Sequence, residues 1–166
     1  MSRMFEIKKE SLNRDLERYQ QGKRLIALGC EATEREWRAV ILFHAKTVVK
    51  GRDGEIALAG PVVCGIRYHE RFLSEAPHPM EIVTILEPRG VFHPNCSPSG
   101  AMCLGHPTPG LTLESILNQV WAGVNLNMKV VDTRPGNIVN RDAARWVVAN
   151  AQRFPLCRHG LLEGPA

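Results

Sequence analysis

The chain has 166 residues, of which 44% are hydrophobic and 23% charged, and its formal net charge is +4. This composition is that of a globular protein and excludes disordered, fibrous and coiled-coil classes, and the length predicts one domain spanning 1–166 around one core. The charge is too small by itself to indicate nucleic-acid binding, and no apolar run approaches the ~20 residues that span a membrane.

The first 24 residues predict a charged amphipathic helix. Its apolar stripe recurs at spacings of 7, 4 and 3 residues and ends before Gly22: Phe5, Leu12, Leu16 and Tyr19. Charged residues at the start of the chain leave no apolar stretch for a secretory signal, so we expect a cytoplasmic protein. Seven basic side chains stand here against four acidic ones. This excess is either a solvated helix face or a docking surface for an acidic partner.

Residues 25–86 predict four short strands that follow one another as an antiparallel meander. The predicted strands are 25–30, 37–45, 62–68 and 82–86. The Gly-Arg-Asp-Gly sequence at 51–54 is typical of a hairpin turn and lies between the second and third strands. Cys30 and Cys64 fall inside strands, where we expect small buried hydrophobic side chains.

The segment 87–111 predicts a long functional loop. It holds five Pro and four Gly in 25 residues, between strand patterns on one side and a helix pattern on the other. Two of the five cysteines, Cys96 and Cys103, lie in it, and Cys157 has no informative neighbours. An odd number of cysteines without paired short spacings fits neither a disulfide framework nor a two-knuckle zinc site.

Two further helices are predicted after the loop. The first has an unbroken stripe over 113–124 and Thr112 as its N-cap. The turn at 132–137 ends this pattern, and Asn140 can cap a last helix. Its predicted buried stripe is Ala143, Ala144, Val147, Val148 and Ala151. The order of elements predicts an α+β fold, with the helices on one face of the sheet or at its ends.

Three interpretations of the loop are open from residue types and spacing. Cys103 could be a nucleophile, with the Asn95 amide as a hydrogen-bond donor to a developing oxyanion. The spacing His93-x2-Cys96-x6-Cys103-x2-His106 could instead supply four zinc ligands. Finally, these side chains could simply be packed in a structural loop.

The residues themselves resemble a known signature. His93-Pro94-Asn95, followed eight residues after Asn95 by Cys103-Leu104, is similar to the active-site sequence of ubiquitin-conjugating enzymes. The proline-bearing segment 72–83 and the Val-Asn-x2-Ala-Ala-x-Trp sequence at 139–146 resemble the same family, as does the order of elements. The chain departs from the family at 106–110, which lacks the usual Trp-Ser-Pro-like stretch, and at Asn137, where many members have an acidic or Ser residue.

The resemblance implies a ubiquitin-conjugating-enzyme-like fold with an N-terminal helix, a four-stranded meander, an active-site loop and C-terminal helices. It implies that Cys103 carries a ubiquitin-like protein as a thioester and passes it to an amine of a target protein. Asn95 would polarise the thioester carbonyl or order the loop, and His93 and Pro94 would support that loop. No cofactor is implied for this chain, because the activating enzyme consumes the ATP.

The resemblance also implies partners. The N-terminal helix would dock on an adenylating, ubiquitin-activating-enzyme-like protein through its basic residues: Lys8, Lys9, Arg14 and Arg18. The use of 15 Arg against 6 Lys suggests a GC-rich genome and thus a bacterial relative. Such bacterial proteins are encoded with a ubiquitin-like protein and its activating enzyme, often in antiphage defence clusters. The alternative function is a non-enzymatic binding module stabilised by zinc on His93, Cys96, Cys103 and His106.

Overall fold

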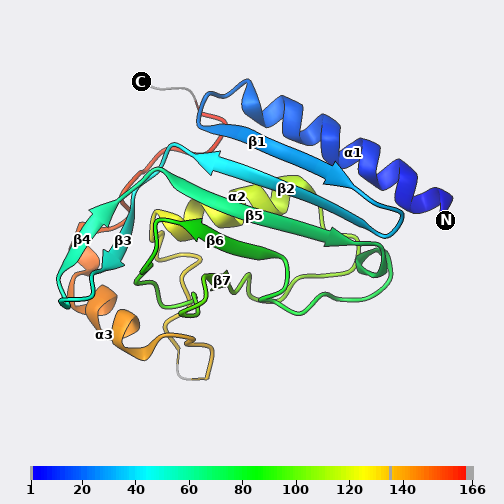
Figure 1. Ribbon diagram of the computed structural model, residues 1–166. Helices are drawn as coiled ribbons and strands as arrows, with labels where there is room; N and C mark the ends of the chain where they lie inside the picture. The colour runs from blue at the N-terminus through cyan, green and yellow to red at the C-terminus, as the bar shows by residue number, and fades with distance from the viewer. Residues whose placement is uncertain (1, 135, 164–166) are drawn as a thin grey trace.

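The structure is a computed structural model that describes residues 2–134 and 136–163, so Met1, Pro135 and the last three residues of the predicted domain lie outside the described residues. Its centre is a five-stranded antiparallel sheet in the order β1-β2-β5-β6-β7 (Figure 1). The strands are β1 (Leu25–Ala32), β2 (Glu36–Phe43), β5 (Val62–His69), β6 (Val83–Glu87) and β7 (Ala101–Met102). The fold is α+β, and the antiparallel order of the first four strands agrees with the sequence prediction.

The strands of the sheet alternate between a buried and an exposed face. In β5 the side chains of Val62, Cys64, Ile66 and Tyr68 are buried, and Arg67 between them is exposed. The strand β1 differs, because its pairing with β2 shifts between residues 27 and 29 and all of residues 28–32 are exposed. The prediction that Cys30 is buried is therefore wrong: the thiol lies on the exposed stretch of an edge strand.

The predicted direct meander is interrupted by a separate hairpin. The turn at 51–54 was placed correctly, but it joins two additional strands, β3 (Thr47–Lys50) and β4 (Ile56–Ala59), which form their own two-stranded sheet. With four residues each, these strands are too short to give a clear alternation in the sequence. The main sheet also gains β7 at its edge, from inside the predicted loop.

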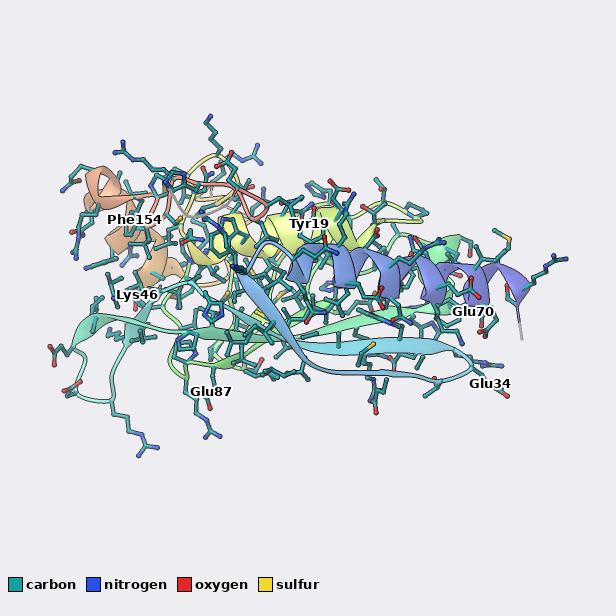
Figure 2. All side chains as sticks on the ribbon, turned by 90° about the horizontal axis from the view of Figure 1, so that it is seen from above. Tyr19, Glu34, Lys46, Glu70, Glu87 and Phe154 are labelled. Carbon is teal, nitrogen blue, oxygen red and sulfur yellow. The ribbon has the colours of Figure 1, made fainter. Side chains whose placement is uncertain are left out.

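The helices lie on one side of the sheet (Figure 2). They are α1 (Arg3–Gln20), α2 (Leu113–Val124) and α3 (Arg141–Ala149), followed by the 3₁₀ turn η2 (Ala151–Arg153); a further 3₁₀ turn, η1 (Glu70–Leu73), follows β5. The side chains of Thr112 and Asn140 cap α2 and α3 as predicted, each by accepting a backbone N–H three residues ahead. No helix among residues 2–134 and 136–163 has the length and apolar character needed to cross a membrane.

The last helix ends earlier than the predicted stripe. Ala143, Ala144 and Val147 are buried, but Val148 is 57% exposed and Ala151 is exposed in η2. A nine-residue helix makes two and a half turns, and only its inner face meets the rest of the chain.

The interior has two buried clusters rather than the single core that the length predicts. The larger one lies between the main sheet and the helices α1 and α2. The smaller one joins β3, the loop and α3: Val48, Phe92, Leu126, Val131, Ala143 and Val147. The additional hairpin contributes Val48, which packs with Ala143 and Val147 of α3. The second cluster therefore holds α3 against the long loop.

Candidate functional site

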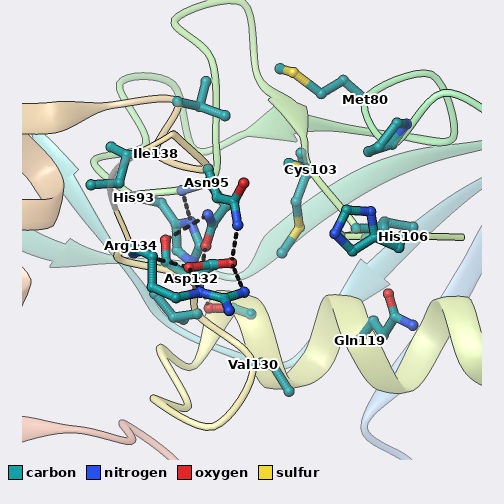
Figure 3. A pocket seen from close by; sticks show the side chains of 18 of the residues that line it. Met80, His93, Asn95, Cys103, His106, Gln119, Val130, Asp132, Arg134 and Ile138 are labelled. Carbon is teal, nitrogen blue, oxygen red and sulfur yellow. Dashed lines mark hydrogen bonds and ion pairs between the residues drawn. The ribbon is translucent and has the colours of Figure 1, made fainter.

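The long loop, α2 and the segments 78–80, 130–134 and 136–139 surround a cavity of about 500 Å³. Cys103 follows β7 directly and lies on the wall of this cavity, half-buried. Figure 3 shows its side chain between a polar cluster that contains Asn95, Asp132 and Arg134 on one side and His106 on the other. The structure thus brings together Asn95 and Cys103, two of the predicted site residues, with His93 and His106 also lining the cavity.

His93 supports the loop through both of its ring nitrogens. Its side chain is 2% exposed. Nδ1 accepts the backbone N–H of Asn95 at 3.0 Å, and Nε2 lies 3.0 Å from the carbonyl oxygen of Gly123 in α2. Because a carbonyl only accepts, Nε2 carries the proton and the ring is neutral. Burial lowers the pKa of His93 to about 4.

Pro94 and Asn95 connect the loop to the segments that follow α2. The carbonyl oxygen of Pro94 accepts the backbone N–H groups of Val139 and Asn140, both at 2.9 Å, just before α3 begins. The Asn95 side chain, 5% exposed, donates Nδ2–H to the carbonyl of Asp132 at 2.9 Å and accepts the Asp132 N–H on Oδ1 at 3.1 Å. One N–H of the amide remains for another acceptor. The side chain therefore orders the Asp132 segment and keeps one donor.

Cys103 and Cys96 are in different environments although both lie in the loop. The backbone N–H of Cys103 donates to the Asn95 carbonyl at 2.8 Å, which sets the thiol beside the Asn95 segment. Cys96 is 2% exposed, and burial together with the neighbouring Cys103 raises the pKa of its thiol to about 12. A thiol that stays protonated and out of reach of solvent is a poor nucleophile. Of the two cysteines in the loop, Cys103 is therefore the candidate nucleophile, because it is the one that lines the cavity.

The four residues of the zinc alternative do not form a ligand set. In the part of the chain that the structure describes, no three His, Cys, Asp or Glu side chains are grouped so that they could hold a metal ion. Both ring nitrogens of His93 already have backbone partners, and Cys96 belongs to the larger buried cluster. The spacing in the sequence therefore does not bring these four side chains together as a ligand set among the described residues.

Sequence reasoning missed a charged cluster at the cavity. Asp132 and Arg134 were seen only as part of a turn, yet both line the cavity with Asn137. Two hydrogen bonds from the Arg134 side chain, one from its backbone N–H and one from Asn137 hold the pKa of the Asp132 carboxyl well below its usual range. An Asp followed two residues later by Arg in a Pro-Gly turn is the local signal that could have indicated this pair.

The four basic residues proposed for docking on α1 are not equivalent. Lys8 Nζ donates to the carbonyls of Gly110 and Leu111, at 3.2 and 2.9 Å, and burial lowers its pKa. Lys9 pairs with Glu6 at 2.6 Å, and its side chain is 12% exposed. Through these bonds, and through the one from Lys9 Nζ to the carbonyl of Thr33, the two lysines hold α1 to other segments of the chain, and their expected docking role stays a prediction.

The other two basic residues of α1 are exposed. Arg14 faces solvent, and Arg18 shares a 3.0 Å ion pair with Glu114 of α2 in which both side chains are 53% exposed. The accessible positive charge of the proposed surface is thus confined to Arg14 and Arg18.

Comparisons with known proteins bear on the fold. No protein-family model matches the chain, and no curated protein matches it. Among solved structures, S. cerevisiae Ubc12 is similar, with 19% sequence identity, a TM-score of 0.50, and coverage of 86% of this chain and 71% of that chain. At this identity the likeness concerns the fold: the chain has the arrangement of a UBC-like protein, as the loop signature suggested.

Proposed function

We propose that this protein is a ubiquitin-conjugating-enzyme-like acyltransferase that carries a ubiquitin-like protein as a thioester on Cys103 and transfers it to an amine of a target protein. The observation that carries the proposal is the half-buried Cys103 thiol on a cavity wall of a UBC-like fold, joined by backbone to the buried Asn95. The setting that the sequence resemblance implies is the bacterial cytoplasm, in antiphage defence.

The chemistry has two half-reactions. In charging, the Cys103 sulfur attacks the thioester that links the C-terminal glycine to the activating enzyme; a new C–S bond forms, the old one breaks, and the activating enzyme's sulfur takes up the proton. In transfer, an amine nitrogen attacks the same carbonyl carbon, the C–N bond forms, and the Cys103 thiol is regenerated. Adenylation has already activated the acyl group, so this chain supplies position and oxyanion stabilisation. The free N–H of Asn95 is the donor that we assign to the oxyanion.

We also propose that the activating enzyme docks on α1 through an acidic surface. Arg14 and Arg18 are the basic residues of this face that remain available. Lys8 and Lys9 act indirectly, because they hold α1 to residues 110–111 and to the β1–β2 turn. Exposed charges of this kind raise association rates more than affinity, so docking should weaken with salt.

The test is formation of a covalent adduct. The chain is incubated with ATP, an adenylating enzyme and a ubiquitin-like protein; any such pair encoded beside its gene is tried first, and ubiquitin with its activating enzyme second. We expect an adduct that a reductant removes in the wild type, a reductant-resistant oxyester in Cys103→Ser, and none in Cys103→Ala. The oxyester resists cleavage by the reductant because an alkoxide is a poorer leaving group than a thiolate.

The matched controls are two other cysteines. Cys96→Ala tests a buried thiol in the same loop, and Cys30→Ala tests an exposed thiol far along the chain from the cavity. Both variants should form the adduct normally. A thioester that survives in Cys103→Ala and disappears in Cys96→Ala would show that the assigned nucleophile is wrong.

A further inference from the structure

A buried glycine of α2, Gly123, lines the cavity together with Met102, the residue before Cys103. Glycine is the poorest helix former after proline, so its presence inside α2 calls for a reason in the packing. A Cβ at Gly123 would lie 2.0 Å from Cε of Met102 and 3.8 Å from its Sδ. The end of the Met102 side chain therefore lies where any residue other than glycine would place its Cβ.

The backbone of Met102 is held on both sides, so its side chain is the part that can move. Met102 pairs with Val83 of β6 in the main sheet and with Cys96 in an antiparallel bridge. Its side chain is 3% exposed and belongs to the larger buried cluster. Protein interiors have few voids, so a side chain that is displaced there needs an empty volume to enter. The volume that both Met102 and Gly123 face is the cavity that Cys103 also lines.

Gly123 also reaches the site through its backbone. Its carbonyl is one of the last four of α2, which lack an i+4 partner within the helix. This carbonyl accepts Nε2–H of His93 at 3.0 Å, from the same ring whose Nδ1 accepts the Asn95 N–H. The backbone N–H of Cys103 in turn donates to the Asn95 carbonyl. Gly123 is therefore connected to Cys103 along two routes, the packing of Met102 and the hydrogen bonds of the loop.

Resting on the proposed function, we propose that Gly123 is a positioning residue for the reaction at Cys103. The space of its missing side chain holds the end of Met102 and keeps the cavity open for the acyl group that Cys103 accepts. A methyl group at residue 123 would force the Met102 methyl to retreat by roughly 1.5–2 Å, to the usual separation of about 3.5–4.0 Å between carbon atoms. The volume lost is cavity volume. Since a misplacement of about 1 Å can cost about 10²-fold in rate, a partial intrusion should be measurable.

The test compares a large and a small reagent at the same thiol. A synthetic peptide that ends in a Gly-Gly mercaptoethanesulfonate thioester is exchanged onto Cys103, in a Cys30→Ser/Cys157→Ser background because these two thiols are exposed or half-buried. The Cys103 sulfur attacks the thioester carbon, a new C–S bond forms, the old one breaks, and mercaptoethanesulfonate leaves with the proton. In parallel, the same thiol is alkylated by iodoacetamide, a much smaller reagent. Both rates are followed by intact mass.

We expect Gly123→Ala to slow acyl exchange about tenfold and to leave alkylation by iodoacetamide nearly unchanged. Met102→Leu removes Cε and keeps atoms out to the position of Sδ, which lies at an ordinary contact distance from the added Cβ. The double variant Gly123→Ala/Met102→Leu should therefore exchange as fast as Met102→Leu alone. The matched control is Gly29→Ala, where a Cβ meets nothing within 4 Å apart from its chain neighbours, and it should change neither rate.

Three results would overturn the inference alone. If Gly123→Ala exchanges at the wild-type rate, the space at this residue is not needed. If it slows both reagents equally, it has disturbed the thiol rather than filled the cavity. If the double variant stays slower than Met102→Leu, or does not fold, Met102 is not the side chain that Gly123 accommodates. Should Gly123→Ala alone fail to fold, the double variant decides by the same comparison.

A different result would refute the proposed function. This is failure of Cys103 in the unsubstituted cavity to accept the acyl group, while the same peptide loads a free thiol in solution. The inference would then fall with the proposed function, whereas the three results above leave that function in place.

Discussion

Lowering the pH should destabilise the loop that carries the site, because the buried ring of His93 has no place for a second proton. In the neutral ring, Nδ1 accepts the Asn95 N–H and Nε2 donates to Gly123. Protonation at Nδ1 would set two N–H groups against each other and leave a charge without a solvent contact. The same loop sets the backbone position of Cys103 through the Asn95 carbonyl, so the effect reaches the site.

The magnitude follows from the difference between the two states of the chain. The pKa of His93 is about 4 in the folded protein, against 6.5 for an unperturbed ring. The unfolded chain binds this proton between pH 6.5 and 4 and the folded chain does not, so stability falls as the pH drops through this window. A difference of about 2.5 units corresponds to about 3 kcal/mol at pH 4, with the full stability retained above pH 6.5. This is a large part of the stability of a domain of this size.

The assay is urea unfolding followed by tryptophan fluorescence, at several pH values between 7.5 and 4, for the wild type and His93→Gln. The glutamine can donate to the Gly123 carbonyl but does not titrate, and it leaves the buried Asn95 N–H without an acceptor at a cost of about 1–3 kcal/mol. We expect the variant to be less stable at pH 7.5 and the two curves to converge as the pH falls. The contributions of the other titrating groups to the pH dependence are the same in both proteins and cancel in the difference between the two curves. Parallel curves would refute the argument.

Three other changes have expected outcomes. Asn95→Ala should slow transfer from the Cys103 thioester to an amine by about 10²-fold, with a smaller loss in charging, as single-turnover assays of the two half-reactions can show. Gly100→Ala should lower the free energy of unfolding by about 1–3 kcal/mol in urea titrations, because φ there is +89° and a Cβ would clash with the Ile85 carbonyl. Arg14→Glu should slow charging at low ionic strength, and a loss that does not shrink with added salt would contradict electrostatic docking.

The elements that the sequence predicted well are those whose pattern repeats over several turns or residues. The stripe of α1 and the stripe of α2 are buried as expected, since 18 and 12 residues give each helix several repeats. The caps Thr112 and Asn140 were predicted from residue type, because an N-cap is decided by local hydrogen bonding. Alternation in β5 likewise spans eight residues.

The features that sequence reasoning missed depend on contacts between distant segments. The partial burial of Lys8 and the exposure of Cys30 both depend on what lies opposite in the fold, which residue type does not reveal. The ion pair of Asp132 and Arg134 is local, but its position beside Cys103 depends on the Asn95 amide, 37 residues earlier in the chain. The proposed chemistry therefore rests on a short motif, whereas the charges that line the cavity come from a segment with no motif of its own.

The loop at 93–95 explains how such a short motif can organise the whole site. Each of its three residues makes a different connection: His93 to α2, Pro94 to the start of α3, and Asn95 to both Asp132 and Cys103. We expect a substitution at any of the three to change stability as well as chemistry at Cys103, so the two half-reactions have to be measured beside the free energy of unfolding. The Arg134 side chain is 77% exposed and donates to the Asp132 carboxylate, so truncating it alters charge without altering these three connections. The Asp132–Arg134 pair, rather than the motif, is thus where the charge of the cavity can be changed independently of the fold.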